Sequence, residues 1–470
     1  MKKNKIAIAG ASGFVGQNLT SAILKNTDHN LVCLSRSIRT YDSPRVESRT
    51  CDFYSMGDSE NALEGCDQAI YLMHSMSVYN RLSQGSFIDF DYLLADNFAR
   101  AAKKAGIKNI IYIGGMGNDE KENLSEHLTS RIEMERVLAS RGTPVTVLRC
   151  SMIIGPQGSS FLVLKRLVER LPVMGLPKWI KTQSQPIYIK DVIKIILNLL
   201  DSDKHWGRTY DCGSPQVCDY KDIIRYIAES LSLKRVLVDL PAIPIEVSRL
   251  WVSVISRADS KLVYPLIDSV DTPMILGNKR RLPKAMEPDY TAIGDAVDES
   301  IHRFALANEQ GRGKPGASVK SRKEVRSIQT LIVPKGYNAY HLARLFVFWL
   351  PRFLTHFLRV KRDRDNVDFH FSVLPISLLN LELIKDKSNE ERQLFKISGG
   401  ILTKQNDQGR FEFRIAKTRN MAIAAVHDYQ PALPWWIYRS SQALVHKWVM
   451  KEFNKFLTRL DEKIRSREAQ

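Results

Sequence analysis

The most restrictive feature of the sequence is a glycine-rich turn near its start, Gly10-Ala11-Ser12-Gly13-Phe14-Val15-Gly16. The apolar run Ile6–Ala9 before it predicts a buried strand, and the amphipathic stretch Gln17–Lys25 after it predicts a helix. Glycines three apart at such a junction permit a tight turn, close approach of a pyrophosphate and close packing of helix on strand. Free N–H groups at the helix start would hold the phosphates, so we predict a dinucleotide site here rather than a turn without a ligand. The predicted contact residues are Gly10, Ala11, Ser12, Gly13, Phe14, Val15 and Gly16.

Short apolar runs and amphipathic stretches alternate through residues 1–160. The runs predict buried strands at Leu31–Leu34, Ala69–Met73, Ile110–Ile113 and Val145–Leu148. The stretches predict helices at Asp91–Ala105 and Ser130–Ser140. This alternation indicates an α/β fold with a doubly wound parallel sheet of the Rossmann type.

The rest of the chain divides into three parts by composition. Residues 161–307 are less regular and predict a small substrate lobe. Residues 308–327 are basic, rich in glycine and nearly free of large apolar side chains, so we assign them to a linker. Residues 328–470 predict a separate α+β domain, with strands at 367–374, 394–402, 411–415 and 422–426, a turn at 406–409 and a helix over 435–460.

The net charge of +18 is concentrated at the C-terminal end. Residues 1–300 hold 38 Lys and Arg against 35 Asp and Glu, whereas residues 301–470 hold 31 against 16. A strongly basic surface favours polyanions or anionic lipid headgroups. No nucleic-acid recognition motif is evident, so we expect contact with an anionic membrane or with a protein partner.

The ends of the next three strands suggest which cofactor binds. Arg36 stands near the position where NAD-binding proteins carry an acid, and its guanidinium could pair with the 2′-phosphate of NADP, which makes NAD the less favoured cofactor. An ordinary surface arginine is the alternative. Asp52 could bond an adenine amino group, with Phe53 near the ring. Met73 and His74 end the fourth strand, and His74 suits a pocket wall and a catalyst equally well.

Several phrases resemble the atypical and extended short-chain dehydrogenase/reductases, in particular the NmrA-like and YbjT-like NAD(P)-binding proteins. The resemblance covers roughly residues 4–300 and extends to the nucleotide-binding accessory subunit of respiratory complex I. It rests on Gly10–Gly16, Asp52, residues 109–115, residues 147–156 and residues 185–192.

One departure from that family is informative. Classical members carry Tyr-x-x-x-Lys on the helix after the fifth strand, where the Tyr is the proton donor. Here His127 stands in place of the Tyr and Arg131 in place of the Lys. Four residues apart on a helix, the two side chains share a face. They are our candidates for catalysis; the alternative is that they only contact the nicotinamide ribose or solvent.

The C-terminal domain contains an aromatic-rich apolar stretch, residues 342–358, with arginines among or beside it. It suits either an interfacial amphipathic helix or a helix buried against a sheet, and Pro351 is expected to kink or split it. Lys361 and Arg362 are expected in a solvated loop. We interpret the repeat Gln442, His446 and Met450 as helix packing.

The six cysteines are scattered without metal-ligand spacing, no apolar stretch is long enough to span a membrane, and no signal peptide is recognisable. We therefore expect a cytoplasmic protein, with peripheral membrane contact through its basic domain. The predicted function is an NADP(H)-dependent oxidoreductase acting on a lipophilic or quinone-like substrate. The alternative is a non-catalytic NAD(P)-binding sensor or assembly protein.

Overall fold

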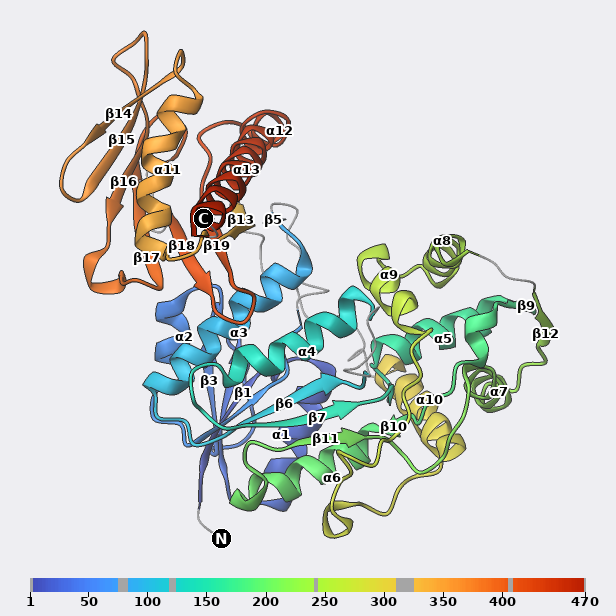
Figure 1. Ribbon diagram of the computed structural model, residues 1–470. Helices are drawn as coiled ribbons and strands as arrows, with labels where there is room; N and C mark the ends of the chain where they lie inside the picture. The colour runs from blue at the N-terminus through green and yellow to red at the C-terminus, as the bar shows by residue number, and fades with distance from the viewer. Residues whose placement is uncertain are drawn as a thin grey trace. The chain divides into compact units, whose positions relative to one another are not determined.

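The computed structural model describes residues 3–74, 83–117, 124–240, 244–309, 325–404 and 409–468. Contacts divide the chain into two compact units (Figure 1). Unit 1 consists of residues 1–78 and 91–319, and unit 2 of residues 79–90 and 320–470. Most of the expected linker and most of the expected turn at 406–409 lie outside the described residues.

Unit 1 is built on a parallel sheet in the order β11-β7-β6-β4-β1-β2-β3, as far as its described residues show. Its strands are β1 (Lys5–Ala9), β2 (Asn30–Ser35), β3 (Val46–Thr50), β4 (Gln68–Tyr71), β6 (Ile110–Gly115), β7 (Val145–Cys150) and β11 (Thr209–Cys212). The direction of progression reverses between β1 and β4, which makes the carboxyl edge at this point the expected ligand crevice. The α/β class expected from the sequence is confirmed.

Helices cover both faces of this sheet, and the apolar strands are buried between them (Figure 1). On one face lie α1 (Phe14–Asn26) and α6 (Ile189–Leu200). On the other lie α2 (Met56–Leu63), α3 (Phe87–Lys104) and α4 (Glu126–Ala139).

The remainder of unit 1 forms a smaller lobe beyond the carboxyl ends of the strands (Figure 1). Two short parallel strand pairs, β8–β10 and β9–β12, belong to it. Its strands are β8 (Ile153–Ile154), β9 (Val173–Leu176), β10 (Ile187–Tyr188) and β12 (Val236–Asp239). Its helices are α5 (Ser159–Arg170), α7 (Tyr220–Ser230), α8 (Ile245–Ser256), α9 (Ser260–Ser269) and α10 (Ile293–Glu309).

Unit 2 contains an antiparallel sheet in the order β14-β15-β16-β17-β18-β19-β13, to which β5 adds in parallel. The strands are β5 (Ser83–Gln84), β13 (Val325–Ile332), β14 (Leu358–Arg362), β15 (Asn366–Phe371), β16 (Ser377–Leu383), β17 (Arg392–Gly399), β18 (Arg410–Ala416) and β19 (Met421–Tyr429). Strand β13 begins within the stretch assigned to the linker. Lys361 and Arg362 lie in β14 rather than in a loop, because Leu358 and Val360 alternate with the basic residues and turn toward the core.

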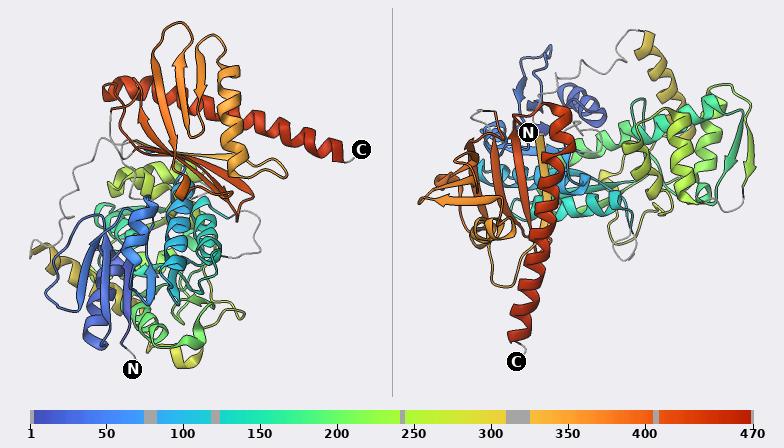
Figure 2. Two further views of the ribbon diagram at one scale, coloured as in Figure 1. Left: turned by 90° about the vertical axis from the view of Figure 1, so that its left-hand side faces the viewer. Right: turned by 90° about the horizontal axis from the view of Figure 1, so that it is seen from above.

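Three helices accompany this sheet: α11 (Ala339–Phe353), α12 (Trp435–Ser440) and α13 (Gln442–Glu468). Figure 2 shows that α13 crosses the sheet and extends past it. Phe346 of α11, Phe413 of β18 and Phe453 of α13 form one buried aromatic cluster. Pro351 does not split α11; it lies in the last turn, and the helix ends two residues after it, at Phe353. The expected terminal helix is broken at Ser441.

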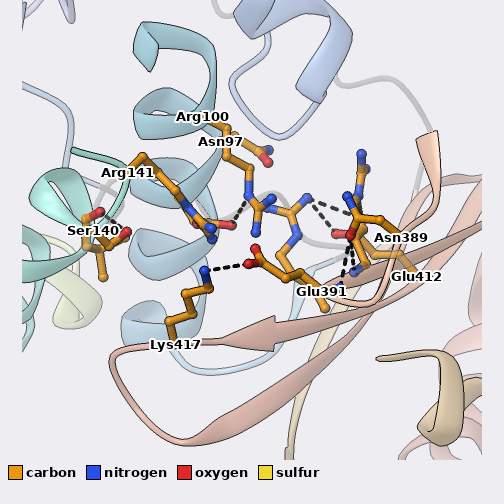
Figure 3. A network of polar contacts seen from close by, with 12 residues as sticks. Asn97, Arg100, Ser140, Arg141, Asn389, Glu391, Glu412 and Lys417 are labelled. Carbon is orange, nitrogen blue, oxygen red and sulfur yellow. Dashed lines mark hydrogen bonds and ion pairs between the residues drawn. The ribbon is translucent and has the colours of Figure 1, made fainter. Parts of the chain in front are cut away.

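A buried carboxylate lies within this sheet. Glu412 of β18 is fully buried and accepts hydrogen bonds from Arg392 Nε (2.6 Å), Arg414 Nη2 (3.2 Å) and His427 Nε2 (3.1 Å). Figure 3 shows Glu412 and the more exposed pair Glu391–Lys417. Burial alone would raise the pKa of Glu412, but Arg392 and Arg414 hold it well below its usual range, so the carboxylate is charged.

No helix among the described residues is both long and apolar enough to cross a membrane.

Candidate active site

The glycine-rich turn adopts the geometry that its sequence predicts. Gly10 has φ +91°, a conformation that side chains other than glycine rarely adopt. A Cβ on Gly16 would lie 2.3 Å from the Gly10 carbonyl oxygen, so only glycine fits there. The Gly13 N–H donates to the Gly10 carbonyl at 2.9 Å and closes the turn.

Helix α1 begins directly after this turn with an open N-terminus. Gly13 is its N-cap and supplies no side-chain cap, and no acidic residue occupies the first turn. The N–H groups at a helix start carry partial positive charge and need acceptors. This end of α1 therefore suits a phosphate group.

A cavity of about 330 Å³ lies next to this turn, between the carboxyl ends of the strands and the small lobe. Phe14 and Val15 of α1 contribute to its wall. Most other lining side chains are apolar, among them Leu164, Leu167 and Trp179. Its polar lining side chains include His74, His127 and Arg131.

His74 follows β4 and is oriented by a buried carboxylate. Its Nδ1 lies 3.2 Å from Asp91 Oδ2, and Ser130 Oγ donates to the same oxygen at 3.1 Å. Because an ionised carboxylate only accepts, Nδ1 must carry the proton and Nε2 must be an acceptor. Nε2 is buried without a hydrogen-bond partner among the described residues.

His127 is held in the same tautomer by a chain of serines. Ser269 gives its only hydroxyl proton to the Pro265 carbonyl at 2.8 Å, so its oxygen must accept from its other partners. Those partners are Ser125 Oγ at 2.9 Å and His127 Nδ1 at 3.2 Å. His127 Nδ1 therefore carries the proton, and its Nε2 is an acceptor. The His74 and His127 rings lie 5.1 Å apart, centroid to centroid.

Arg131 completes the polar wall of the cavity. Its Nη2 donates to the Ile113 carbonyl at 2.7 Å, and its guanidinium lies over the Tyr112 ring at 5.3 Å. Its Nη1 is buried and has no hydrogen-bond partner in the described part of the chain. A buried donor without a partner costs about 1–3 kcal/mol, so a ligand that accepts from Nη1 would recover stability.

The electrostatics of this wall favour neutral imidazoles. Burial lowers the pKa of His74 below its ordinary 6.5, and Arg131 lowers it further against the opposing effect of Asp91. Burial, His74 and Arg131 together lower the pKa of His127 well below 6.5. At neutral pH the cavity thus presents acceptor nitrogens on two imidazoles beside one fixed cation.

Comparison with known proteins agrees with this geometry. Residues 10–167 match the family described as NAD(P)H-binding. These residues are an NAD(P)H-binding domain. The auxiliary protein GraX of Staphylococcus aureus is 25% identical over 138 residues, which are 29% of this chain and 44% of that protein.

A second relative is subunit 9 of the NADH dehydrogenase [ubiquinone] 1 alpha subcomplex from Arabidopsis thaliana mitochondria. It is 24% identical over 219 residues, which are 45% of this chain and 54% of that protein. The chain therefore spans about half the length of the curated relatives it matches.

Solved structures show the same fold. A nucleoside-diphosphate-sugar epimerase from Staphylococcus aureus (16% identity) and the triphenylmethane reductase of Citrobacter sp. (15% identity) each superpose with a TM-score of 0.50. Each match covers 63% of this chain and 99% of the other. The family resemblance noted in the sequence is confirmed for the NAD(P)H-binding domain and its architecture.

The other predicted cofactor residues of the NAD(P)H-binding domain follow the carboxyl ends of its strands. Arg36 follows β2 and is exposed, Asp52 follows β3, and Met73 follows β4. Phe53 is buried against Phe98, with 5.6 Å between ring centroids, so its ring supports the loop that carries Asp52. Of the predicted residues, Phe14, Val15, His74, His127 and Arg131 line the cavity, whereas Arg36, Asp52, Phe53 and Met73 do not.

Sequence reasoning missed the residues that orient the two imidazoles. Asp91 begins a predicted helix, and an acid next to the apolar Phe90 could have been noticed. Ser269 is 142 positions from His127 and carries no local signal. No cluster that could hold a metal occurs among the described residues.

Proposed function

We propose that this protein is an NADP(H)-dependent oxidoreductase whose substrate is a lipophilic, quinone-like molecule. The observation that carries the proposal is the cavity, which joins the first turn of α1 to a mostly apolar wall containing His74, His127 and Arg131. A mostly apolar pocket with a few convergent polar groups is typical of small-molecule sites.

The residues present fit the cofactor. The turn Gly10–Gly16 would hold the pyrophosphate, Asp52 the adenine and Arg36 the 2′-phosphate. Arg131 Nη1, buried without a protein acceptor in the described residues, would donate to a ribose hydroxyl or a substrate oxygen. NADPH, when bound, supplies the hydride.

The two imidazoles act as hydrogen-bond acceptors in this site. Neutral His74 and His127 accept hydrogen bonds from hydroxyl groups, so they would bind and orient the hydroxyl of a ribose or of a reduced substrate. They are poor acids at neutral pH, because Arg131 and burial disfavour the imidazolium. An acceptor whose reduction needs no enzymatic acid, such as a quinone, suits this site better than an aldehyde.

Transfer of deuteride from stereospecifically labelled NADPH to a panel of quinones and aldehydes tests the proposal. We expect quinone-dependent oxidation of NADPH that removes deuterium from one face of the nicotinamide only. The label is measured in the NADP⁺ formed, because the O–D of a hydroquinone exchanges with water. Tight NADPH binding with no transfer to any acceptor would contradict an enzymatic role.

Cofactor choice is tested by Arg36→Ala, with Arg39→Ala as the matched control from the same loop. Loss of a charge-assisted pair to the 2′-phosphate should weaken NADPH binding by about 10- to 100-fold and leave NADH binding unchanged. Equal losses for both cofactors in isothermal titration would contradict the 2′-phosphate role.

A non-catalytic NAD(P)-binding sensor or assembly protein is the second candidate. The specific observation in its favour is that His127 and Arg131 stand where a catalytic Tyr and Lys are expected. In addition, GraX is named an auxiliary protein and the plant relative a subunit of a larger complex. The deuteride experiment separates the two candidates.

A further inference from the structure

The two ends of the unit 2 sheet differ in character. Because the strands from β14 to β19 are antiparallel neighbours, every second connection lies at the same end. One end contains residues 354–357, 372–376, 400–404 and 430–434. The other contains residues 363–365, 384–391 and 417–420, which mix acidic, basic and polar side chains.

The first end exposes an unusual number of large apolar side chains, which we call the apolar rim. Val373 is 80% exposed and Trp436 is 73% exposed. The rim consists of Phe357, Phe371, Val373, Leu374, Ile376, Ile401, Trp436, Leu444, Val445 and Trp448. Residues 363–365, 384–391 and 417–420 of the opposite end include no exposed large apolar side chain. Tyr340, in the first turn of α11 near Glu390, is 44% exposed there.

Contacts join the segments of the rim into one surface. The Ser372 N–H donates to the Phe357 carbonyl at 3.1 Å, and the Ile401 N–H donates to the Ser377 carbonyl at 3.0 Å. The Ala432 N–H donates to the Leu402 carbonyl at 3.0 Å. The rings of Phe353 and Trp448 lie 4.9 Å apart, which connects the end of α11 to the beginning of α13. The rim is therefore a continuous patch rather than scattered exposure.

The charge around the rim has a single sign. Residues 352–359, 371–377, 399–404 and 430–448 contain no Asp or Glu. Exposed cations flank the apolar side chains: Arg352, Arg359, Lys404 and Lys447. Protruding aliphatic and tryptophan side chains surrounded by cations match the interface of a bilayer that contains anionic lipid.

We propose that the apolar rim docks unit 2 onto an anionic membrane surface. The rim side chains enter the boundary between headgroups and acyl chains, and Arg352, Arg359, Lys404 and Lys447 contact the phosphates. A second copy of this chain would bring like charges together, and a nucleic acid would leave Val373, Leu374 and Ile401 in water. This inference does not depend on the proposed chemistry of unit 1.

Co-sedimentation of the full-length protein with vesicles tests the docking. We expect binding to vesicles containing phosphatidylglycerol, weak binding to pure phosphatidylcholine and a marked loss at high salt.

Two matched pairs of variants separate the apolar and charged contributions. Val373→Ser with Leu374→Ser should weaken binding about tenfold, whereas Val236→Ser with Val238→Ser, which changes similarly exposed residues of β12, should not. Arg352→Gln, Arg359→Gln and Lys447→Gln together should weaken it on the order of 100-fold. The control Lys25→Gln, Lys103→Gln and Lys204→Gln lowers the net charge equally in unit 1 and should have little effect.

Two results would overturn the proposal. One is the absence of binding to anionic vesicles at low salt, or equal binding by the rim variants and their controls. The other is tight binding of a DNA oligonucleotide that the charge variant loses and the Val373/Leu374 variant keeps, because this would assign the basic surface to nucleic acid.

Discussion

Each unit of this protein buries a cluster of charged and titratable side chains, and the two clusters are completed in different ways. In unit 2 the buried Glu412 carboxylate is met by Arg392, Arg414 and His427, all from the same sheet. In unit 1 the wall of the cavity leaves His74 Nε2 and Arg131 Nη1 without partners among the described residues. The first cluster pairs its carboxylate within the sheet, whereas the second places its unpartnered atoms in the wall of a cavity, as in a site that takes a ligand.

The largest expected effect concerns the Glu412 cluster of unit 2. Glu412→Gln removes a carboxylate charge that compensates two buried arginines, and breaking such a pair typically costs about 3–5 kcal/mol. Urea unfolding of the full chain should show this loss in the free energy of unfolding of unit 2. The control Lys417→Gln breaks the more exposed pair with Glu391 and should change little. Equal small effects in both variants would show that the buried Glu412 cluster contributes no more to stability than the exposed Glu391–Lys417 pair.

An intermediate effect is expected at Arg131, in the cavity wall of unit 1. Arg131→Met should weaken NADPH binding by roughly 10- to 30-fold, because a charge-assisted hydrogen bond to the ligand is lost. The free energy of unfolding without ligand should fall by only about 1–2 kcal/mol, because Nη2 loses its bond to the Ile113 carbonyl whereas Nη1 has no protein acceptor to lose. Isothermal titration and urea unfolding measure the two quantities. A stability loss as large as that of Glu412→Gln would contradict a ligand-binding role.

The clusters should also respond to acid in different pH windows. The pKa values of His74 and His127 are lowered in the folded state. Their contribution to the free energy of unfolding of unit 1 is therefore present above pH 6.5 and is lost as the pH falls below 6.5. The pKa of Glu412 is lowered from 4.5 in the folded state. Its contribution to the free energy of unfolding of unit 2 is therefore present above pH 4.5 and is lost only as the pH falls below 4.5. Thermal unfolding between pH 7 and pH 3, with His74→Asn/His127→Asn and Glu412→Gln as references, measures both windows. If both units lost stability over the same pH range, the assignment of the first loss to the histidines and the second to Glu412 would be contradicted.

The smallest effect is expected for Ser269→Ala. It removes the acceptor that fixes the His127 tautomer and should lower NADPH binding or turnover only a few-fold, as expected for one hydrogen bond of about 1 kcal/mol. Ser253→Ala, a serine of α8 that does not line the cavity, is the control. A large loss would indicate that His127 takes a more direct part than its position suggests.

The sequence predicted those features of the fold that depend on local patterns. Strands β1, β2, β4, β6 and β7 of unit 1 are built on apolar runs, and the turn Gly10–Gly16 requires glycine for steric reasons that its spacing reveals. The spacing of four between His127 and Arg131 placed both on one helix face, and both line the cavity. Strand β14 was missed because exposed basic residues hid its alternation, a common feature of edge strands. The partners of the imidazoles were missed because Asp91 and Ser269 reach them only through tertiary packing.

The pairing of β5 with β13 has a practical consequence for dissecting this molecule. Residues 79–90 belong to unit 2 although they precede most of unit 1 in the chain. A fragment that starts at residue 320 would keep the pairing of β13 with β19 but would lack β5, which covers part of the other edge of β13. Unpaired edges of this kind promote association with other chains, so such a fragment should aggregate unless residues 79–90 are fused back to it.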